Sequence, residues 1–207
     1  MVKLIFVGIQ GSGKGTQAQI ISKKMGICPI SSGDLLRGSE GELKKEVDSY
    51  INNGNLVPDE LILRILKQRI DKPDCKKGFI LDGYPRNSSQ IKDLKKITSI
   101  DKAVYIKISD KEAIKRMKGR WNCKKCSIAY NYATEPKPKV LGICDKCHGK
   151  LEQRKDDVSD EAIQKRLETF HSEISAILKG YPIIDINGEQ TIEQVTNEIM
   201  QKLETSK

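Results

Sequence analysis

Residues 2 to 17 read Val-Lys-Leu-Ile-Phe-Val-Gly-Ile-Gln-Gly-Ser-Gly-Lys-Gly-Thr-Gln. The short apolar run from Leu4 to Val7 is typical of a buried strand. A glycine-rich turn follows it, and residues 17 to 25 then show helical periodicity with apolar residues on one face. Strand, glycine loop and helix are the context that a phosphate-binding loop requires. The sequence therefore predicts such a loop at the start of an α/β fold.

The loop offers two kinds of group to a phosphate. Glycines let backbone N–H groups point around phosphate oxygens, at a helix N-terminus that already favours anions. Lys14 is expected to reach the β- and γ-phosphates. An ordinary glycine turn with a solvated lysine is the alternative, but strand, spacing, lysine and helix all favour the phosphate loop. One departure from the general pattern is that Gly15 follows the lysine directly and Thr16 comes one position later.

Composition indicates a soluble chain of 207 residues, of which 31% are charged and 5% aromatic. This length allows one domain with a large core and small inserts. No apolar run approaches the roughly 18 residues of a membrane span, and no secretory signal precedes the first strand. We therefore expect a cytoplasmic protein without a membrane partner. A net charge of +9 would suit nucleic acid, but the lysines are dispersed and not interleaved with aromatics, so we expect a solvated surface.

Arginine is scarce, because only eight of the 37 basic residues are arginine. A lysine-rich chain has a reason to use arginine where planar, bidentate contacts to phosphate are needed. Arg64 and Arg69 lie in a plain helical stretch and are expected at the surface. The other six, which lie in or beside the motifs below, are Arg37, Arg86, Arg116, Arg120, Arg154 and Arg166.

The rest of the chain alternates strands with helices. Further strands are expected over residues 27–30, 78–81, 103–108 and 183–186, and helices over residues 31–37, 42–52, 59–71, 88–97, 110–118, 160–178 and from 191 onward. This alternation predicts a parallel sheet covered by helices on both faces. Residues 119–157 break the rhythm with cysteines, prolines and glycines and little helical periodicity, so they are expected to form an insert.

Two Cys-x-x-Cys pairs, Cys123–Cys126 and Cys144–Cys147, stand 17 residues apart within this insert. The spacing is a strong zinc signal. Four thiolates close a tetrahedral site without an open position, which makes a zinc ion there structural and not catalytic. The insert has few large apolar residues, so the metal would supply its folding energy. Two disulfides or free thiols are the alternative, although disulfides are disfavoured in a cytosolic chain.

The remaining cysteines and the histidines have no predicted chemistry. Cys28 and Cys75 are isolated in the sequence near apolar segments, so we expect ordinary buried thiols. His148 abuts a cysteine pair that already has four thiols, and His171 lies in the middle of an expected helix.

Over essentially its whole length the chain resembles the adenylate kinase family, in the long form with a zinc-bearing lid. Four motifs carry this resemblance in the family's order: the Gly-x-x-Gly-x-Gly-Lys-Gly-Thr loop, Ser-Ser-Gly-Asp-Leu-Leu-Arg at 31–37, Gly-Asn-Leu-Val at 54–57, and Asp-Gly-Tyr-Pro-Arg at 82–86 followed by Gln90. The resemblance implies a P-loop NTPase-type α/β fold, with a five-stranded parallel sheet flanked by helices, a helical monophosphate-binding insert and a small zinc-binding lid. The implied parts are a core of residues 1–30, 58–118 and 158–207, an AMP-binding insert of residues 31–57, and a zinc-binding lid of residues 119–157.

The activity that the resemblance implies is Mg²⁺-dependent, reversible phosphoryl transfer from ATP to AMP, giving two ADP for adenine nucleotide homeostasis. The partners would be these three nucleotides, with no nucleic acid, and the enzyme would be a monomer. The nucleophile is a phosphate oxygen, already anionic, so no Ser, His or Cys base is needed. Catalysis then consists of aligning two polyanions and neutralising charge, while a mobile lid excludes water.

Site residues follow from the resemblance position by position. The catalytic residues would be Lys14, Asp82, Arg86, Arg120, Arg154 and Arg166. ATP would be bound by Gly11, Ser12, Gly13, Lys14, Gly15, Thr16, Arg116, Arg120, Ala129, Tyr130 and Gln190. AMP would be bound by Ser32, Arg37, Ile51, Val57, Gly83, Arg86, Gln90, Arg154 and Arg166. Structural Zn²⁺ would be bound by Cys123, Cys126, Cys144 and Cys147. Asp82 would orient water on Mg²⁺, with a helix cap beside Tyr84-Pro85 as the alternative.

Other functions stay open at this point. Within the same fold, UMP or CMP could be the acceptor, or GTP the donor. A nucleic-acid-binding ATPase could use the cysteine pairs as a zinc ribbon, although the motif from Asp82 to Gln90 and the sparse aromatics argue against it. A nucleotide-binding regulator without turnover is the third alternative.

Overall fold

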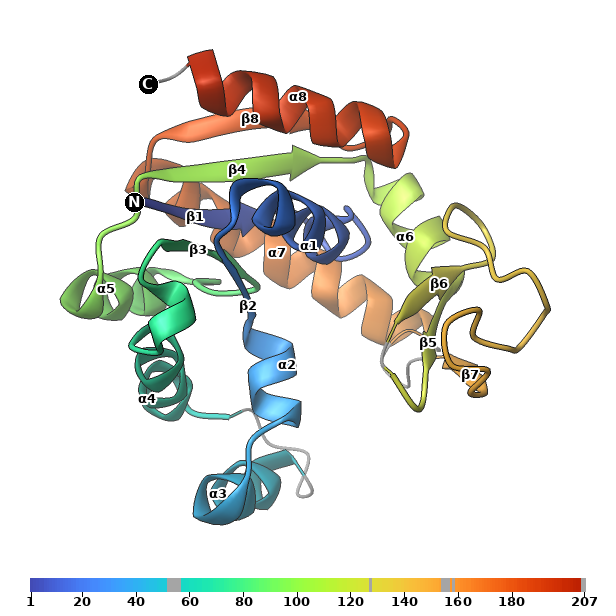
Figure 1. Ribbon diagram of the computed structural model, residues 1–207, viewed down its shortest axis with the longest axis horizontal. Helices are drawn as coiled ribbons and strands as arrows, with labels where there is room; N and C mark the ends of the chain where they lie inside the picture. Colours follow the sequence, from blue (N-terminus) through green and yellow to red (C-terminus); the bar gives the residue numbers. More distant parts are fainter. Residues whose placement is uncertain (52–56, 127, 154–156, 158, 206–207) are drawn as a thin grey trace.

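A five-stranded parallel sheet forms the centre of the molecule in a computed structural model that describes residues 1–51, 57–126, 128–153, 157 and 159–205 (Figure 1). Its strands, in spatial order, are β2 (Cys28–Ser31), β3 (Gly78–Asp82), β1 (Val2–Val7), β4 (Lys102–Lys107) and β8 (Ile183–Asn187). Every neighbouring pair is parallel. The predicted fold class is confirmed. The ends of β2, β3, β4 and β8 agree with the predicted ends to within one residue, whereas β1 begins two residues before the predicted Leu4.

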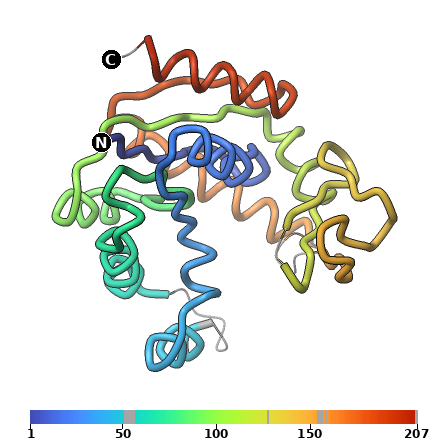
Figure 2. The backbone as a smooth tube through the Cα atoms, viewed as in Figure 1, coloured from blue at the N-terminus to red at the C-terminus, as the bar shows by residue number. Residues whose placement is uncertain are grey.

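Helices cover both faces of this sheet, as the tube in Figure 2 shows. One face is covered by α1 (Lys14–Met25) and α8 (Ile192–Thr205), and the other by α4 (Asp59–Ile70), α5 (Ser88–Ile97) and α7 (Asp160–Gly180). A short helix, α6 (Asp110–Lys118), packs against α7 beside the sheet. Among the described residues, none of the helices combines the length and apolar character that a membrane span requires.

The alternation of side chains along β1 explains how its apolar run is buried on both faces. Leu4 and Phe6 pack with α1 and α8, whereas Ile5 and Val7 pack with the helices on the opposite face. All four are at most 5% exposed. A strand of a parallel sheet that is covered on both faces needs such a continuous apolar run.

A helical arm extends from the sheet between β2 and α4. It contains α2 (Ser32–Arg37) and α3 (Gly41–Ile51), which lie below the sheet in Figure 1. Val47 of α3 is fully buried against Leu61 and Ile65 of α4. The arm therefore rests on α4 and carries little core of its own.

The cysteine-rich insert is a second small sheet at the other side of the molecule. It contains β5 (Arg120–Cys123), β6 (Ala129–Asn131) and β7 (Leu151–Gln153), in the order β6-β5-β7 with antiparallel pairing. Its buried cluster is built from cysteines together with Tyr130 and Leu151. The insert was expected from sequence, whereas its three strands were not, because each is only three or four residues long.

Candidate functional site

The first helix begins at Lys14, three residues before the position at which periodicity placed it, because the glycine loop itself turns into the helix. Gly13 precedes it with φ of 92°, a left-handed conformation that favours glycine. No side chain caps this helix. Its first N–H groups are therefore directed at the loop, as anion binding requires.

Lys14 folds back over the loop. Its Nζ donates hydrogen bonds to the carbonyls of Gly8 at 2.6 Å and Ile9 at 2.9 Å. Burial lowers the pKa of Lys14 from 10.5 to about 8, opposed by the charge of Asp82. The ammonium is thus poorly solvated, and an arriving phosphate would supply the counter-charge that water does not.

Three arginines reinforce this positive field. Arg86, Arg120 and Arg166 each lower the pKa of Lys14 further through their charges. They come from the loop after β3, from the first residue of β5 and from α7. Cations from four separate elements therefore converge on one point at the carboxyl edge of the sheet, where open α/β sheets bind ligands.

Asp82 is the acidic counterpart of these cations. It is the last residue of β3 and pairs with Phe6 of β1. Burial raises its pKa, while the charge of Lys14 opposes that rise. A Cβ atom on Gly15 would lie 3.2 Å from Asp82 Oδ2, so the glycine after the lysine makes room for the carboxylate. Among the described residues, none donates a hydrogen bond to Asp82, which leaves its oxygens free to accept metal-bound water.

A second carboxylate, Asp157, holds two of the arginines. Arg120 donates to it from Nε and Nη2 at 2.8 and 2.9 Å, and Arg166 donates from Nη1 at 2.7 Å. Asp157 is 0% exposed. Its role was not predicted from the sequence, where the available signal was its place in an acidic pair that begins two residues after Arg154.

The predicted acceptor residues meet at the carboxyl ends of β2 and β3. Ser32 Oγ and Arg86 Nε both donate to the carbonyl of Gly83, at 2.9 and 2.7 Å. Gln90 Oε1 accepts from the backbone N–H of Arg86 at 2.6 Å. Ser32 and Gln90 are buried. The structure thus brings four of the predicted residues into one hydrogen-bonded group.

Asp59 fixes the orientation of the Gln90 amide, because Gln90 Nε2 donates to Asp59 Oδ1 at 2.7 Å. Sequence reasoning had read Asp59 only as a helix-start signal. Farther along the arm, Arg37 pairs with Asp34 and stays more than half exposed. Val57 is half-buried beside the α3–α4 contact. Arg154 lies outside the described residues, as does the side chain of Ile51, so neither prediction is tested.

The predicted donor residues beyond the loop come from α6, from β5 and β6 of the insert and from the turn before α8. Arg116 pairs with Glu112 through Nε at 2.8 Å. The side chain of Gln190 donates through Nε2 to Glu198 at 2.8 Å. The predicted contact of Gln190 with a nucleotide base would therefore come from its backbone. Ala129 is exposed, whereas Tyr130 is buried in the insert. The ring of Tyr130 therefore belongs to the cysteine cluster, and a nucleotide would meet this pair through Ala129 and backbone atoms.

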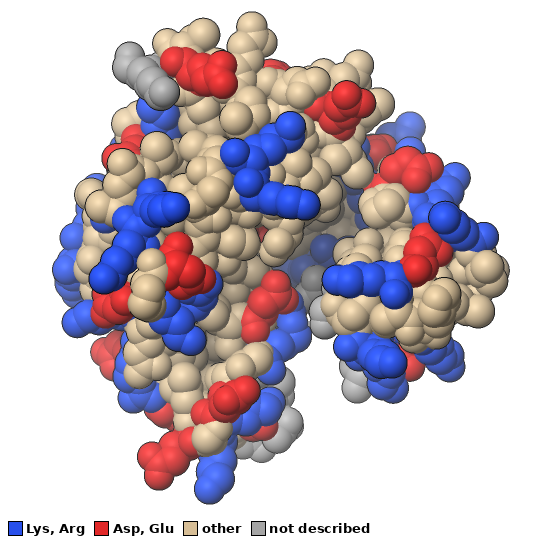
Figure 3. Space-filling model, viewed as in Figure 1, with Lys and Arg blue, Asp and Glu red and all other residues tan. Residues whose placement is uncertain are grey.

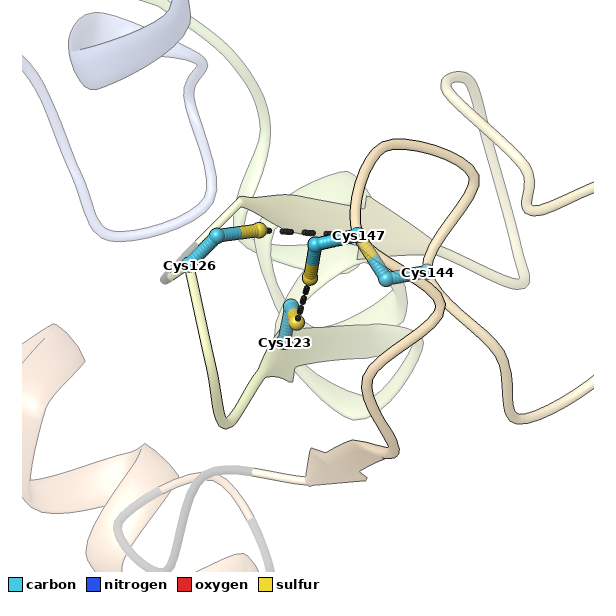
Figure 4. A group of neighbouring side chains, drawn as sticks. All are labelled: Cys123, Cys126, Cys144 and Cys147. Carbon is cyan, nitrogen blue, oxygen red and sulfur yellow. Dashed lines mark hydrogen bonds between the residues drawn. The ribbon is translucent and has the colours of Figure 1, made fainter.

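The four insert cysteines form one cluster (Figure 4). Cys123 Sγ lies 3.3 Å from Cys147 Sγ, and Cys126 Sγ lies 3.5 Å from Cys144 Sγ. In a tetrahedral zinc site with Zn–S bonds of about 2.3 Å, sulfurs are about 3.8 Å apart. All four sulfurs lie within 4.8 Å of one another. The donor set and its spacing are compatible with zinc.

Tyr130 completes the surroundings of the cluster. Its hydroxyl accepts from the backbone N–H of Asp145 at 2.9 Å, which directs the hydroxyl proton at Cys144 Sγ, 3.5 Å away. This hydrogen bond lowers the pKa of the Cys144 thiol to about 6. A metal ligand held as thiolate gains from such a donor.

An open cleft separates the helical arm from the insert on the face shown in Figure 3, and Lys and Arg atoms are visible along it. Elsewhere on this face basic and acidic side chains are interspersed. This distribution agrees with the expected solvated surface.

The prediction that Arg69 lies at the surface was wrong, because its side chain is only 20% exposed and is enclosed by Asp74 and two sulfurs.

Comparison with known proteins gives consistent matches. A family model described as adenylate kinase matches residues 6–185. Adenylate kinase from Caldicellulosiruptor saccharolyticus is 39% identical over 98% of this chain and 99% of its own. Adenylate kinase from Acetivibrio thermocellus is 40% identical over 98% of each chain, and that from Archaeoglobus fulgidus is 39% identical over the whole of both.

The substitution Asp157→Asn tests the arginine-holding carboxylate. It keeps the size of the side chain but removes the charge between Arg120 and Arg166, which are four-fifths buried. We expect the free energy of unfolding to fall by about 3–5 kcal/mol. Asp160→Asn is the control, because Asp160 pairs with Lys118 at the surface and should cost less than about 1 kcal/mol. Urea denaturation of both variants measures the difference; equal losses would contradict the role given to Asp157.

Proposed function

The chain belongs to the adenylate kinase family, and from that premise we propose which of its residues perform the family's reaction. It is a nucleoside monophosphate kinase that catalyses ATP + AMP ⇌ 2 ADP. The observation that carries the residue assignment is the convergence of Asp82, Arg86, Arg120 and Arg166 on Lys14 at the carboxyl edge of the sheet. Two polyanions need such a field to approach each other, and the transferred group needs it to spread its charge.

The donor is bound by the loop and the lid. Backbone groups of Gly11, Ser12, Gly13 and Gly15 surround its phosphates, and Lys14 exchanges its bonds to loop carbonyls for bonds to phosphate oxygens. Arg116 and Arg120 approach from the lid hinge, with Thr16, Ala129, Tyr130 and Gln190 completing the donor site. The family uses Mg²⁺ with ATP, and the ion would neutralise phosphate charge. Asp82 is suited to hold its water, because among the described residues none donates a hydrogen bond to this half-buried carboxylate beside Lys14.

The acceptor is bound in the arm and at the ends of β2 and β3. Arg37, Arg86 and Arg166 would contact its phosphate, and Gln90 would read adenine with an amide already oriented by Asp59. Ser32, Ile51, Val57, Gly83 and Arg154 are assigned to the same site. The proposed division of the chain is an AMP-binding insert of residues 31–57, a lid of residues 119–157 and a core formed by the rest.

The lid holds one structural zinc ion through its four cysteines. Its core consists largely of those cysteines, so the metal replaces the aliphatic packing that such a short insert lacks. The enzyme is proposed to act as a cytoplasmic monomer without nucleic acid, with ATP in preference to GTP as donor. The family match over residues 6–185 supports an enzyme over a zinc-ribbon ATPase or a regulator without turnover.

Lys14→Met tests the assignment of the phosphate loop. It removes the cation but keeps the glycines, so turnover should fall by several powers of ten, while the melting temperature stays close to that of the wild type. Lys23→Met, an exposed change on the same helix, is the control and should keep full turnover. The measurement is a coupled assay of ADP formation. Near-normal turnover in Lys14→Met would refute the assignment.

The pH dependence of ATP binding follows from the pKa of Lys14, which is about 8 in the nucleotide-free protein. Phosphates stabilise the charged ammonium, so they raise this pKa and binding takes up a proton when the free lysine is partly neutral. Affinity for ATP should therefore fall as the pH rises through 8. Calorimetry at pH 8.5 in buffers of different ionisation enthalpy measures the uptake, which should be absent in Lys14→Met. Release of a proton, or no change, would contradict the pKa direction.

Acceptor choice depends on the hydrogen bonds of Gln90. An amide that both donates and accepts suits adenine, and a site built on such bonds penalises a base that leaves them unpaired. AMP should be phosphorylated at least about 100-fold more efficiently than UMP or CMP, and Gln90→Leu should narrow that preference. A coupled assay over the panel of monophosphates measures it. Equal rates with UMP would leave the fold intact but refute the adenine assignment.

Zinc content tests the lid. The protein should hold about one zinc per chain, and Cys144→Ser should loosen the lid before the parallel core, lowering the melting temperature or splitting the transition in two. Some activity should survive at low temperature, because no zinc ligand contacts the transferred phosphate. Elemental analysis and calorimetric melting measure this. Immediate loss of turnover on chelation in excess Mg²⁺, with the lid still folded, would contradict a structural ion.

A further inference from the structure

Four side chains at the amino ends of β2 and β3 form a cluster that the reaction does not use. Cys28 begins β2, Cys75 ends the short 3-10 helix (Pro73–Cys75) before β3, Asp74 lies in that helix, and Arg69 lies in the last turn of α4. Both cysteines are buried, at 4% and 3% exposure. Their sulfurs and a carboxylate oxygen of Asp74 lie within 4.8 Å of one another.

Arg69 joins this group. Its Nη2 lies 2.7 Å from Cys28 Sγ, and its Nη1 lies 2.9 Å from Cys75 Sγ. The same two nitrogens donate to the carboxylate of Asp74 at 2.8 and 2.9 Å. The two terminal nitrogens of one planar guanidinium are close together, so both sulfurs must lie side by side against its edge.

The guanidinium of Arg69 also determines whether the cluster is suited to metal binding or to thiol chemistry. Two thiols and a carboxylate resemble a metal donor set, but a cation already contacts all three groups. A metal ion would have to displace Arg69 and leave its charge four-fifths buried without a partner, which is costly. The geometry therefore favours chemistry between the two sulfurs over metal binding.

We propose that Cys28 and Cys75 are a thiol oxidation site, which a hydroperoxide converts into an intramolecular disulfide. In the first step one sulfur attacks a peroxide oxygen, the O–O bond breaks, and a sulfenic acid and water form. In the second step the other sulfur attacks the sulfenic sulfur, the S–S bond forms, and the S–O bond breaks with release of a second water. Two thiols lose two electrons and two protons, and hydrogen peroxide is reduced to two waters.

Arg69 would assist the first step, because the attacking species is a thiolate and its charge develops against the guanidinium. Without such help the step would be slow, since burial raises the pKa of Cys28 to about 12. The cluster lies close to solvent, because the side chain of Asp74 within it is 59% exposed. A molecule as small as hydrogen peroxide would approach the sulfurs from the side of Asp74.

The disulfide would close a chain loop from residue 28 to residue 75, which contains the whole helical arm. It would lie at the amino ends of the strands, whereas the phosphate loop and Asp82 lie at the carboxyl ends. We therefore expect greater thermal stability with the reaction chemistry retained. This inference does not depend on the residue roles proposed above.

The test is a peptide map of the zinc-loaded wild-type protein after exposure to hydrogen peroxide, with remaining thiols alkylated before digestion. Trypsin releases Cys28 in residues 25–37 and Cys75 in residues 70–76, both separate from the lid cysteines. We expect these two peptides joined, with a mass two hydrogens below their sum, and separated again by a reductant. The melting temperature should rise by roughly 5–15 °C.

Matched variants on α4 test the role of the guanidinium. Arg69→Lys keeps the charge but cannot contact both sulfurs, so it should slow formation of the joined peptide about tenfold. Arg64→Lys, on the same helix with its partner Glu46 at the surface, should form it at the wild-type rate. Formation of the joined peptide at the wild-type rate in Arg69→Lys would contradict the proposed role of Arg69.

Two outcomes would overturn the site itself. One is oxidation confined to the lid cysteines, with residues 25–37 and 70–76 recovered as separate alkylated peptides. The other is a content of two zinc ions per chain in the wild-type protein, with residues 25–37 and 70–76 not joined after peroxide, which would make the cluster a metal site. The wild-type map and metal content decide both outcomes, so neither depends on whether a variant folds.

Discussion

Parallel strands end at the same edge of their sheet, and the positions of the phosphate loop, Ser32 and Asp82 depend on that constraint. The phosphate loop follows β1, Ser32 follows β2, and Asp82 ends β3. These groups therefore lie side by side at the carboxyl ends of three neighbouring strands. Arg120 and Arg166 arrive from outside the sheet. The register of β1 against β3, with Phe6 opposite Asp82, sets the distance between loop and carboxylate without any contribution from a ligand.

Within the part of the chain that the structure describes, basic groups outnumber acidic groups at this edge. Lys14 and three arginines converge there, whereas the described acids that face them are the half-buried Asp82 and the fully buried Asp157. The lowered pKa of Lys14 and the raised pKa of Asp82 have the same origin, since both groups have lost water and have gained only each other and a few neighbours. Nucleotide phosphates would supply the missing anions. The site is organised before substrate arrives, which is what electrostatic catalysis requires.

Sequence reasoning reached much of this arrangement, for identifiable reasons. The phosphate loop and the cysteine pairs are local motifs with fixed spacing, and the five strands are apolar runs between turn residues, so short windows contain the whole signal. Asp157, Asp59 and the cluster at Arg69 were missed because their roles arise from contacts between distant segments. Arg69 is 41 positions from Cys28, and no periodicity within α4 distinguishes it from Arg64, which is at the surface. Tyr130 shows the same limit: its neighbour Ala129 is exposed, while the Tyr130 side chain is buried and its hydroxyl contacts Cys144.

The lid leaves the core and returns to it through adjacent strands. β5 starts at Arg120 and pairs antiparallel with β7, so that Trp121 stands opposite Gln153, and the exit and entry of the chain lie side by side. A segment attached in this way adds no crossover to the main sheet and changes no register within it. It is a modular unit, which evolution could shorten, replace or exchange without altering the architecture of the core.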